Sequence, residues 1–468
     1  MTDLLRRFYS TERMVKPARR IGEITPTGEA YRTSAGIAIP AVAEMVSIAL
    51  MGMVSTAMVG RLGPYAIAAV GLTGQPRMTF ICVFYALNIA VTAVVSRRKG
   101  ENDQRAARSC MRQSLMMAAA LGALMTFLAV RLAGPIMALA GANEETLGPS
   151  TEYFIIVSAG MTMQALSMVI CAAQRGVGNT KVTMYVNMTA NVINVTFNFL
   201  LIEGNLGFPR LGVRGAGFAI LLSNVVGLSL AVRSITDKNS YLYVSLFSGW
   251  RMDAKMIKTL TALGGNSMIE KLALRVGFFI YARIVADLGT KAFAAHQIGM
   301  QMLNLSFTFA DGIAVATTAL VGENLGRERP DLSMMYGQVG QRLAFTVAMA
   351  LCVFSMLSRG WFPRLFTGDA EIVALCGGIF TILAVSQPVQ TSQVVMAGSL
   401  RGAGDARFVA FTMLLTVTII RPVVSYVLGY AFGFGLIGIW TAILVDQVVR
   451  LTLLYRRFTS GSWTRIKV

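Results

Sequence analysis

The strongest constraint on this chain is a series of apolar runs, each long enough to cross a lipid bilayer as a helix. Apolar residues make up 55% of the 468 residues and charged residues only 14%, against about 25% in a typical soluble domain. The sequence therefore predicts an all-α, polytopic membrane protein with twelve transmembrane helices. The expected spans lie at roughly 34–59, 65–96, 109–133, 151–173, 182–203, 213–235, 256–285, 292–322, 336–358, 371–399, 408–430 and 436–455.

The basic residues indicate how these spans are oriented. The chain carries a formal net charge of +19. With the N-terminus placed inside, the cytoplasmic segments hold 30 Lys and Arg residues, and the loops on the other side hold 7. Basic residues concentrate in cytoplasmic loops of membrane proteins, so this split predicts that both termini are cytoplasmic. We attribute the positive charge to topology and expect no nucleic-acid partner.

The chain repeats itself at an offset of 226 residues. VGRLGPYAIAA (59–69) aligns with VADLGTKAFAA (285–295), and AQRGVGNTK (173–181) aligns with SLRGAGDAR (399–407). Six spans per repeat give both halves the same orientation, which predicts two parallel six-helix lobes around a central cavity, as in transporters. The expected divisions are an N-tail (1–33), an N-lobe (34–235), a linker (236–255), a C-lobe (256–457) and a C-tail (458–468).

Several of these motifs resemble the multidrug and toxin extrusion (MATE) family. They are MVGRLGPYAIAAVGL, QRGVGNTK, NVINVTFNFLLIEGNLGFPRLGVRGAGFA, AAHQIGMQ with TTALVGENLG, and LRGAGD, and the resemblance covers roughly 34–456. It implies a secondary antiporter in the cell (inner) membrane that exports small organic, often cationic, compounds as protons or sodium ions enter. The same superfamily contains lipid-linked oligosaccharide flippases, which are the alternative function. We expect a monomer.

Three acids within the spans are the candidate ion-coupling residues, because a charge at the bilayer centre costs about 2.5–3.5 kcal/mol on insertion scales. Glu44 and Glu270 occupy matching positions of the repeat, and Asp311 lies in the eighth span. Each has a structural alternative. Glu270 would pair with Lys271 or Arg275, Glu44 with a residue on another helix, and Asp311 with Arg421.

Polar side chains in the spans are the candidate substrate-cavity residues. The fifth span carries four asparagines at spacings of four, three and four, which share one helix face, and they serve either as cavity wall or as inter-helix glue. The resemblance implies acids at two positions where this sequence has Ser55 and Asn198 instead. Because these usual acids are missing, both H+ and Na+ stay open as the coupling ion. The predicted cavity residues are Ser55, Asn187, Asn191, Asn194, Asn198 and Arg421.

An integral membrane enzyme is the alternative from a different class of protein. Such an enzyme needs a cluster of nucleophiles or metal ligands, and the sequence holds no zinc-protease, nucleophile-elbow or phosphate-loop motif. The five cysteines form no CxxC pair, and the single histidine, His296, lies in an apolar span. We therefore expect a transporter with no catalytic residue, no metal site and no cofactor other than the coupling ion.

The charge split makes a topological prediction. Single cysteines at Asn102 and Lys238 should react with an impermeant thiol reagent only from the cytoplasmic side, and cysteines at Asn143 and Gly368 only from outside. Labelling in intact cells and in inverted vesicles measures this. Labelling at Asn102 from outside the cell would overturn the topology.

Overall fold

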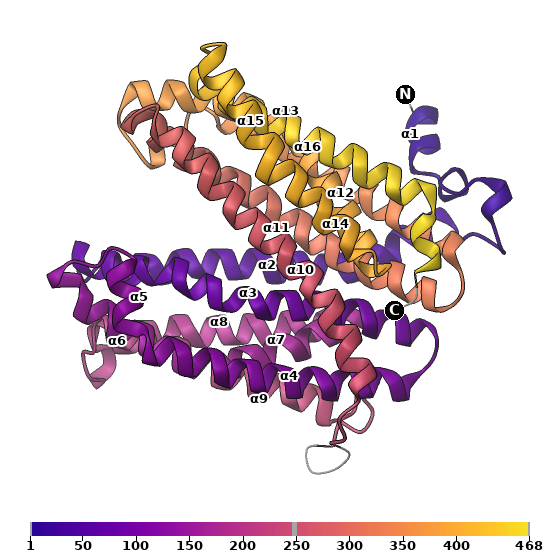
Figure 1. Ribbon diagram of the computed structural model, residues 1–468, viewed down its shortest axis with the longest axis horizontal. Helices are drawn as coiled ribbons and strands as arrows, with labels where there is room; N and C mark the ends of the chain where they lie inside the picture. The colour runs from indigo at the N-terminus through magenta and orange to yellow at the C-terminus, as the bar shows by residue number, and fades with distance from the viewer. Residues whose placement is uncertain (1, 246–249, 467–468) are drawn as a thin grey trace. The chain divides into compact units, whose positions relative to one another are not determined.

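A computed structural model describes residues 2–245 and 250–466 of the chain (Figure 1). The described residues form α-helices, with short 3₁₀ and π-helical segments and no β-strand, so the all-α prediction is confirmed. Four residues of the predicted linker (246–249) and the extreme ends of the two predicted tails lie outside this range.

The chain divides into two compact units. The N-terminal unit comprises Ala43–Lys99 and Asp103–Gly264, and the C-terminal unit comprises Met1–Val42, Gly100–Asn102 and Gly265–Val468. The boundary therefore passes through two long helices, α2 (Thr27–Gly60) and α10 (Ala254–Ala286), each of which contributes residues to both units. The lobe boundaries taken from the repeat stay a prediction.

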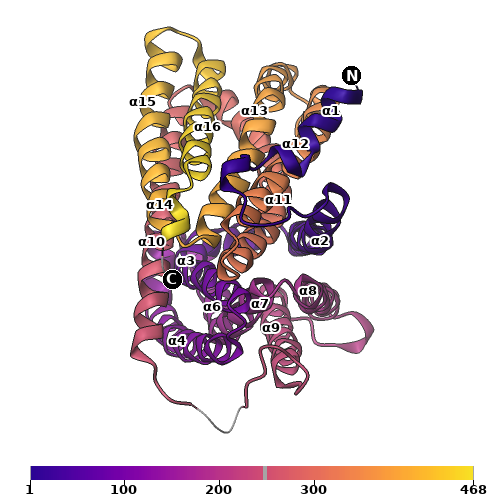
Figure 2. The same cartoon turned by 90° about the vertical axis from the view of Figure 1, so that its right-hand side faces the viewer.

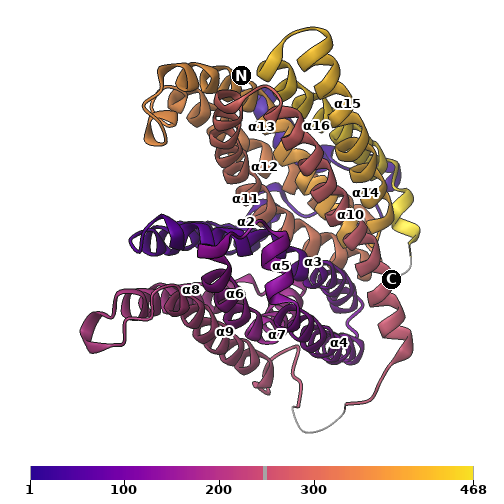
Figure 3. The same ribbon diagram turned by 60° about the vertical axis from the view of Figure 1, so that its left-hand side comes forward.

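The N-terminal unit is a bundle of long helices. Helix α8 packs on α9, α4 packs on α7, and α9 also contacts α6 and α7 (Figure 3). The predicted fourth span is two helices, α6 and α7, which meet at an angle of 44°. Besides part of α2, the helices are α3 (Pro64–Gly100), α4 (Gln104–Arg131), α5 (Ala133–Leu139), α6 (Glu144–Ala159), α7 (Met161–Gly176), α8 (Thr180–Glu203) and α9 (Val213–Thr236).

The C-terminal unit is built around α13, which packs against α11, α12 and α16 (Figure 2). Its eleventh predicted span contains two π-helical segments, η5 (Leu414–Ile420) and η6 (Val427–Ala431), on either side of α15. Pro422 lies in this span and lacks the N–H that an α-helix interior requires. The helices are α1 (Thr2–Tyr9), α11 (Thr290–Gly326), α12 (Pro330–Ser358), α13 (Ala370–Gly402), α14 (Ala406–Met413), α15 (Arg421–Tyr426) and α16 (Gly435–Ser460).

Ten helical segments in the described chain are individually long and apolar enough to cross a membrane, and the bent pair α6–α7 makes an eleventh. Helix α10 has the length of a span, at 33 residues, but is not among them. It carries Glu270, Lys271 and Arg275 within six residues, and these charges lower its hydropathy. The protein is thus a multi-pass membrane protein, and the count of twelve spans stays a prediction.

The sequence repeat is visible in the packing of both units. The Thr92 hydroxyl donates to the Ala172 carbonyl over 3.0 Å, and Thr318, 226 residues later, donates to the Gly398 carbonyl over 2.9 Å. The turns repeat as well, because Gly63 (φ 109°) and Gly289 (φ 102°) both adopt the left-handed conformation that favours glycine. The offset of 226 therefore describes equivalent contacts, not only similar letters.

One of these repeated contacts leads to a stability prediction. A Cβ at Gly402 would lie 2.3 Å from the Thr318 carbonyl oxygen, so Gly402→Ala forces α11 and α13 apart. We expect a loss of about 1–3 kcal/mol, seen as a lower Tm of the purified protein. Gly377→Ala is the control in the same helix, because nothing lies within 4 Å of its added methyl group. Equal Tm values for the two variants would contradict the packing.

Candidate functional site

Glu44 lies buried in the N-terminal unit, where it links three helices. Its carboxylate pairs with the Arg175 guanidinium of α7 at 3.1 Å. It also accepts hydrogen bonds from Thr183 at 2.7 Å and Asn187 at 2.9 Å, both on α8. Both oxygens therefore have partners on other helices, which is the geometry of the structural alternative for Glu44.

Glu270 occupies the matching place in the C-terminal unit. Its carboxylate pairs with Arg401 at the end of α13 over 2.7 Å. The alternative partners predicted from the sequence, Lys271 and Arg275, were wrong, because the partner comes from another helix. Arg175 and Arg401 are themselves related by the 226-residue repeat. The buried ion pair is thus duplicated, once in each unit.

Arg421, predicted to line the cavity, is 1% exposed. Its Nε donates to Asp446 over 2.9 Å, and Asp446 also accepts from Arg450 over 2.6 Å. The predicted Asp311–Arg421 pair is therefore wrong. Sequence reasoning missed the pair of Asp446 and Arg450, although their spacing of four residues within one helix is typical of an intrahelical ion pair.

Asp311 differs from these acids because no residue in the described part of the chain forms an ion pair with it. It is exposed near the middle of α11. No Lys, Arg or His nitrogen within the described ranges lies within 4.0 Å of its carboxylate, although Lys271 and Arg401 lie within electrostatic reach. Unlike Glu44, Glu270 and Asp446, Asp311 therefore carries a negative charge that is not neutralised by an adjacent arginine.

Asp311 ends a polar stripe along α11 that sequence reasoning missed. The stripe follows the helical spacing of four, three, four and three residues, and its members are exposed or half-exposed while most of the positions between them are buried. Amides and a carboxylate facing hydrocarbon would lack partners, so this face borders water or protein. The spacing test applied to the fifth span would have found it. The members are Gln297, Gln301, Asn304, Thr308 and Asp311.

The asparagine stripe of α8 divides into two groups. Asn187 belongs to the Glu44 ion pair, whereas Asn194 and Asn198 form a cluster with Ser55 of α2. The Ser55 hydroxyl donates to Asn194 over 3.0 Å, and Asn198 donates back to Ser55 over 3.1 Å. Asn191, like Asn187 and Asn194, is half-buried, and Asn198 is buried, so the stripe faces the interior of the unit as its spacing predicts. Its role in substrate binding stays a prediction.

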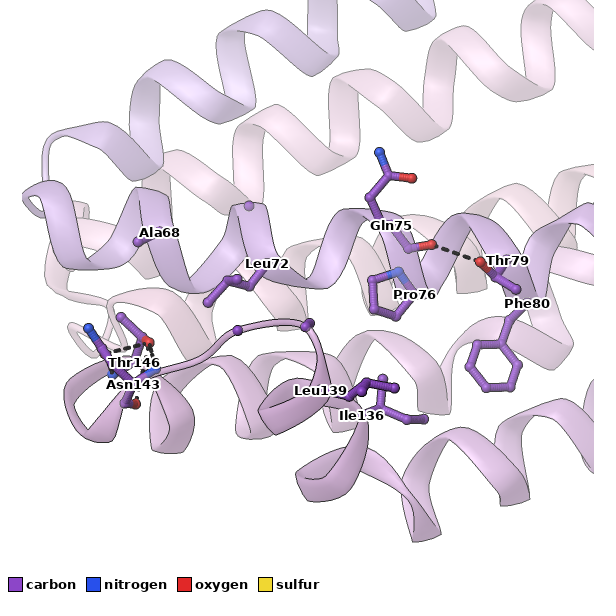
Figure 4. Close-up of a pocket in the computed structure, with 13 residues that line it drawn as sticks. Ala68, Leu72, Gln75, Pro76, Thr79, Phe80, Ile136, Leu139, Asn143 and Thr146 are labelled. Carbon is purple, nitrogen blue, oxygen red and sulfur yellow. Dashed lines mark hydrogen bonds between the residues drawn. The ribbon is translucent and has the colours of Figure 1, made fainter. Parts of the chain in front are cut away.

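The N-terminal unit also contains a groove of about 890 Å³ between α3 and the segment that joins α5 to α6. Leu72 and Phe80 point from α3 toward Ile136 and Leu139, while the amide of Gln75 points to the other side (Figure 4). A smaller cavity of about 490 Å³ lies between α2 and α8. Its lining includes Val54 and Val195, the sequence neighbours of Ser55 and Asn194. The predicted cavity residues line neither space.

The family model MatE matches residues 40–200 and 267–427, at a spacing close to the 226-residue repeat. Similar proteins include the probable multidrug resistance protein NorM of Thermotoga maritima, 28% identical over 92% of each chain. The multidrug resistance protein PmpM of Pseudomonas aeruginosa is 28% identical over 90% of this chain and 91% of its own.

Solved structures show the same fold. An outward-facing multidrug resistance MATE transporter of the MOP superfamily superposes with a TM-score of 0.85 at 21% identity, covering 92% of this chain and 96% of its own. A MOP superfamily transporter from Pyrococcus furiosus gives a TM-score of 0.86 at 21% identity, covering 94% and 97%.

The duplicated ion pair predicts non-additive stability effects. Glu44→Gln should lower stability by about 3–5 kcal/mol, because it leaves a buried arginine uncompensated. The double variant Glu44→Gln/Arg175→Gln should recover part of that loss, and Glu270→Gln with Arg401→Gln should behave alike. Thermal unfolding of the purified variants measures this.

The control is the exposed pair Glu152–Arg214, whose side chains are 46% and 60% exposed. Glu152→Gln should cost no more than about 1 kcal/mol. Additive losses in the buried double variants would show that the paired charges do not interact.

Proposed function

The chain belongs to the MatE family and is therefore a transporter and not an enzyme, and from this premise we propose that it is a cation-coupled antiporter. The proposed cargo is small organic compounds, cationic or amphipathic in character, exported across the cell membrane. Relatives from Thermotoga maritima and Pseudomonas aeruginosa bear the names of multidrug resistance proteins, which supports export. The proposal places both termini in the cytoplasm, in accordance with the basic loops.

Asp311 is the observation that carries the coupling proposal. A coupling site must bind and release a cation during the cycle. Glu44, Glu270 and Asp446 are each paired with an arginine, so binding a proton or Na+ there would leave a buried guanidinium uncompensated. Cation binding at Asp311 would leave no paired arginine uncompensated, and Asp311 lies in the middle of an apolar helix. We therefore assign the coupling ion, H+ or Na+, to Asp311, and a fastening role to Glu44 and Glu270.

The stripe on α11 supports the proposed substrate class. Its amide and hydroxyl groups can hydrogen-bond an organic molecule, and Asp311 at its end attracts a positive charge. Exchange requires that substrate and coupling cation compete for this carboxylate and that each binds a different conformation of the transporter more tightly. The proposal requires no resident cofactor and treats the monomer as the working unit.

A flippase would bind the anionic head of a lipid-linked oligosaccharide with unpaired cationic residues inside its spans. Arg421 is neutralised by Asp446, and Arg283 pairs with Asp287 over 3.3 Å. These two arginines within the predicted spans therefore have acidic partners, and we prefer the exporter.

Proteoliposomes with separately imposed proton and sodium gradients test the proposal. A dye cation should be transported under one gradient and not without it. Asp311→Asn should lower that rate about tenfold or more, because hydrogen bonds to a charged group contribute about 1.5–3 kcal/mol. Asp287→Asn is the control, since this acid is exposed near the end of α10. Transport by Asp311→Asn at the rate of the control would assign coupling elsewhere, and transport without any gradient would refute antiport.

A further inference from the structure

The segment before α2 is a folded part of the C-terminal unit. We define residues 6–26 as the N-terminal arm. Met14 and Val15 are 4% and 1% exposed, in a cluster with Leu325, Phe458 and Trp463. This apolar contact seats the arm against α11 and the end of α16.

Polar contacts fasten the arm on both sides of this cluster. The Arg19 guanidinium donates to the Thr459 carbonyl over 2.8 Å at the end of α16. Gln338 of α12 donates to the Met14 carbonyl over 2.7 Å, and the Ile21 amide donates to Asp331 over 3.1 Å. The arm thus connects the first turns of α12 to the last turn of α16.

Helix α1 lies further along α12 (Figure 2). The Arg342 guanidinium sits 4.5 Å from the Phe8 ring centroid and donates to the Phe8 carbonyl at the end of α1. The Tyr9 hydroxyl lies 2.8 Å from that of Thr346. The 29 residues of α12 extend about 43 Å, more than the roughly 30 Å of hydrocarbon, so its first turns lie outside the apolar layer. Arg342 and Thr346 lie within the predicted span 336–358, whereas the arm's contacts at Asp331 and Thr459 lie outside the predicted spans, so the arm after α1 is held at headgroup depth.

The exposed side of the arm is basic. Residues 1–26 contain six Lys and Arg and three Asp and Glu. Arg6, Arg13 and Lys16 are exposed, while Met14 and Val15 between them point into the core. Because the backbone is already held, a ligand for these three cations would not have to order the chain.

We infer that the N-terminal arm is a fixed basic platform that binds anionic phospholipid headgroups at the membrane face on which the N-terminus lies. Charge complementarity and headgroup depth identify lipid as the occupant. Bound lipid would join α12 and α16 at their ends and so stabilise the C-terminal unit. The inference rests on the cytoplasmic N-terminus of the proposed function, because anionic lipid is most abundant in that leaflet.

The experiment is a lipid titration of the purified full-length protein in neutral detergent, read as the shift in Tm. Phosphatidylglycerol should raise Tm, whereas phosphatidylcholine should not. The variant Arg6→Gln/Arg13→Gln/Lys16→Gln should bind phosphatidylglycerol about a hundredfold more weakly, at roughly fivefold per basic residue near an anionic lipid surface. The effect should shrink at high salt.

The matched control removes three exposed lysines from the N-terminal unit, as Lys181→Gln/Lys238→Gln/Lys255→Gln. This variant should keep the phosphatidylglycerol shift. The inference is overturned if both triple variants lose the shift equally, if the arm variant keeps it, or if inorganic phosphate raises Tm as much as the lipid does. Lipid binding in detergent requires no gradient or substrate, so this result is independent of whether transport is cation-coupled.

Discussion

The arrangement of each unit depends on a buried carboxylate–guanidinium pair at the end of a helix. Arg175 and Arg401 lie in the last turns of α7 and α13, where the partial negative charge of a helix C-terminus favours a cation. Glu44 and Glu270 supply the opposite charge from α2 and α10. Neither partner is stable alone in a low-dielectric interior, so each pair fixes one long helix against another.

This pairing also decides which acids are free to function. Asp446 lies between Arg421 and Arg450, and like Glu44 and Glu270 it is committed to an arginine. Asp311 is the exception, and it ends the polar stripe on α11. A carboxylate paired with arginine fastens helices, whereas an unpaired carboxylate can bind and release a cation. In the function that we propose, the coupling ion therefore binds at Asp311, whose matching position in the first repeat is Tyr85, and not at the duplicated glutamates.

The N-terminal arm extends the same principle to the surface. Its buried side chains, Met14 and Val15, face the core, and its cations face outward. The segment that would be read as a basic tail is therefore a structural element that holds charge at the ends of α12 and α16. Hydrophobic burial fixes its place, and electrostatics determines what it can bind.

The sequence by itself determined the all-α membrane fold, most helix ranges, the repeat and the inward-facing asparagines of α8, because hydropathy and helical spacing are local properties of the chain. Spacing alone would also have shown the stripe on α11. Only the tertiary structure decided the partners of the charges. Glu44 and Arg175 are 131 residues apart, as are Glu270 and Arg401, so sequence proximity favoured Lys271 or Arg275 instead. Which acid remains unpaired depends on the packing of distant helices, because a buried charge is stabilised by whichever opposite charge that packing brings within a few ångströms.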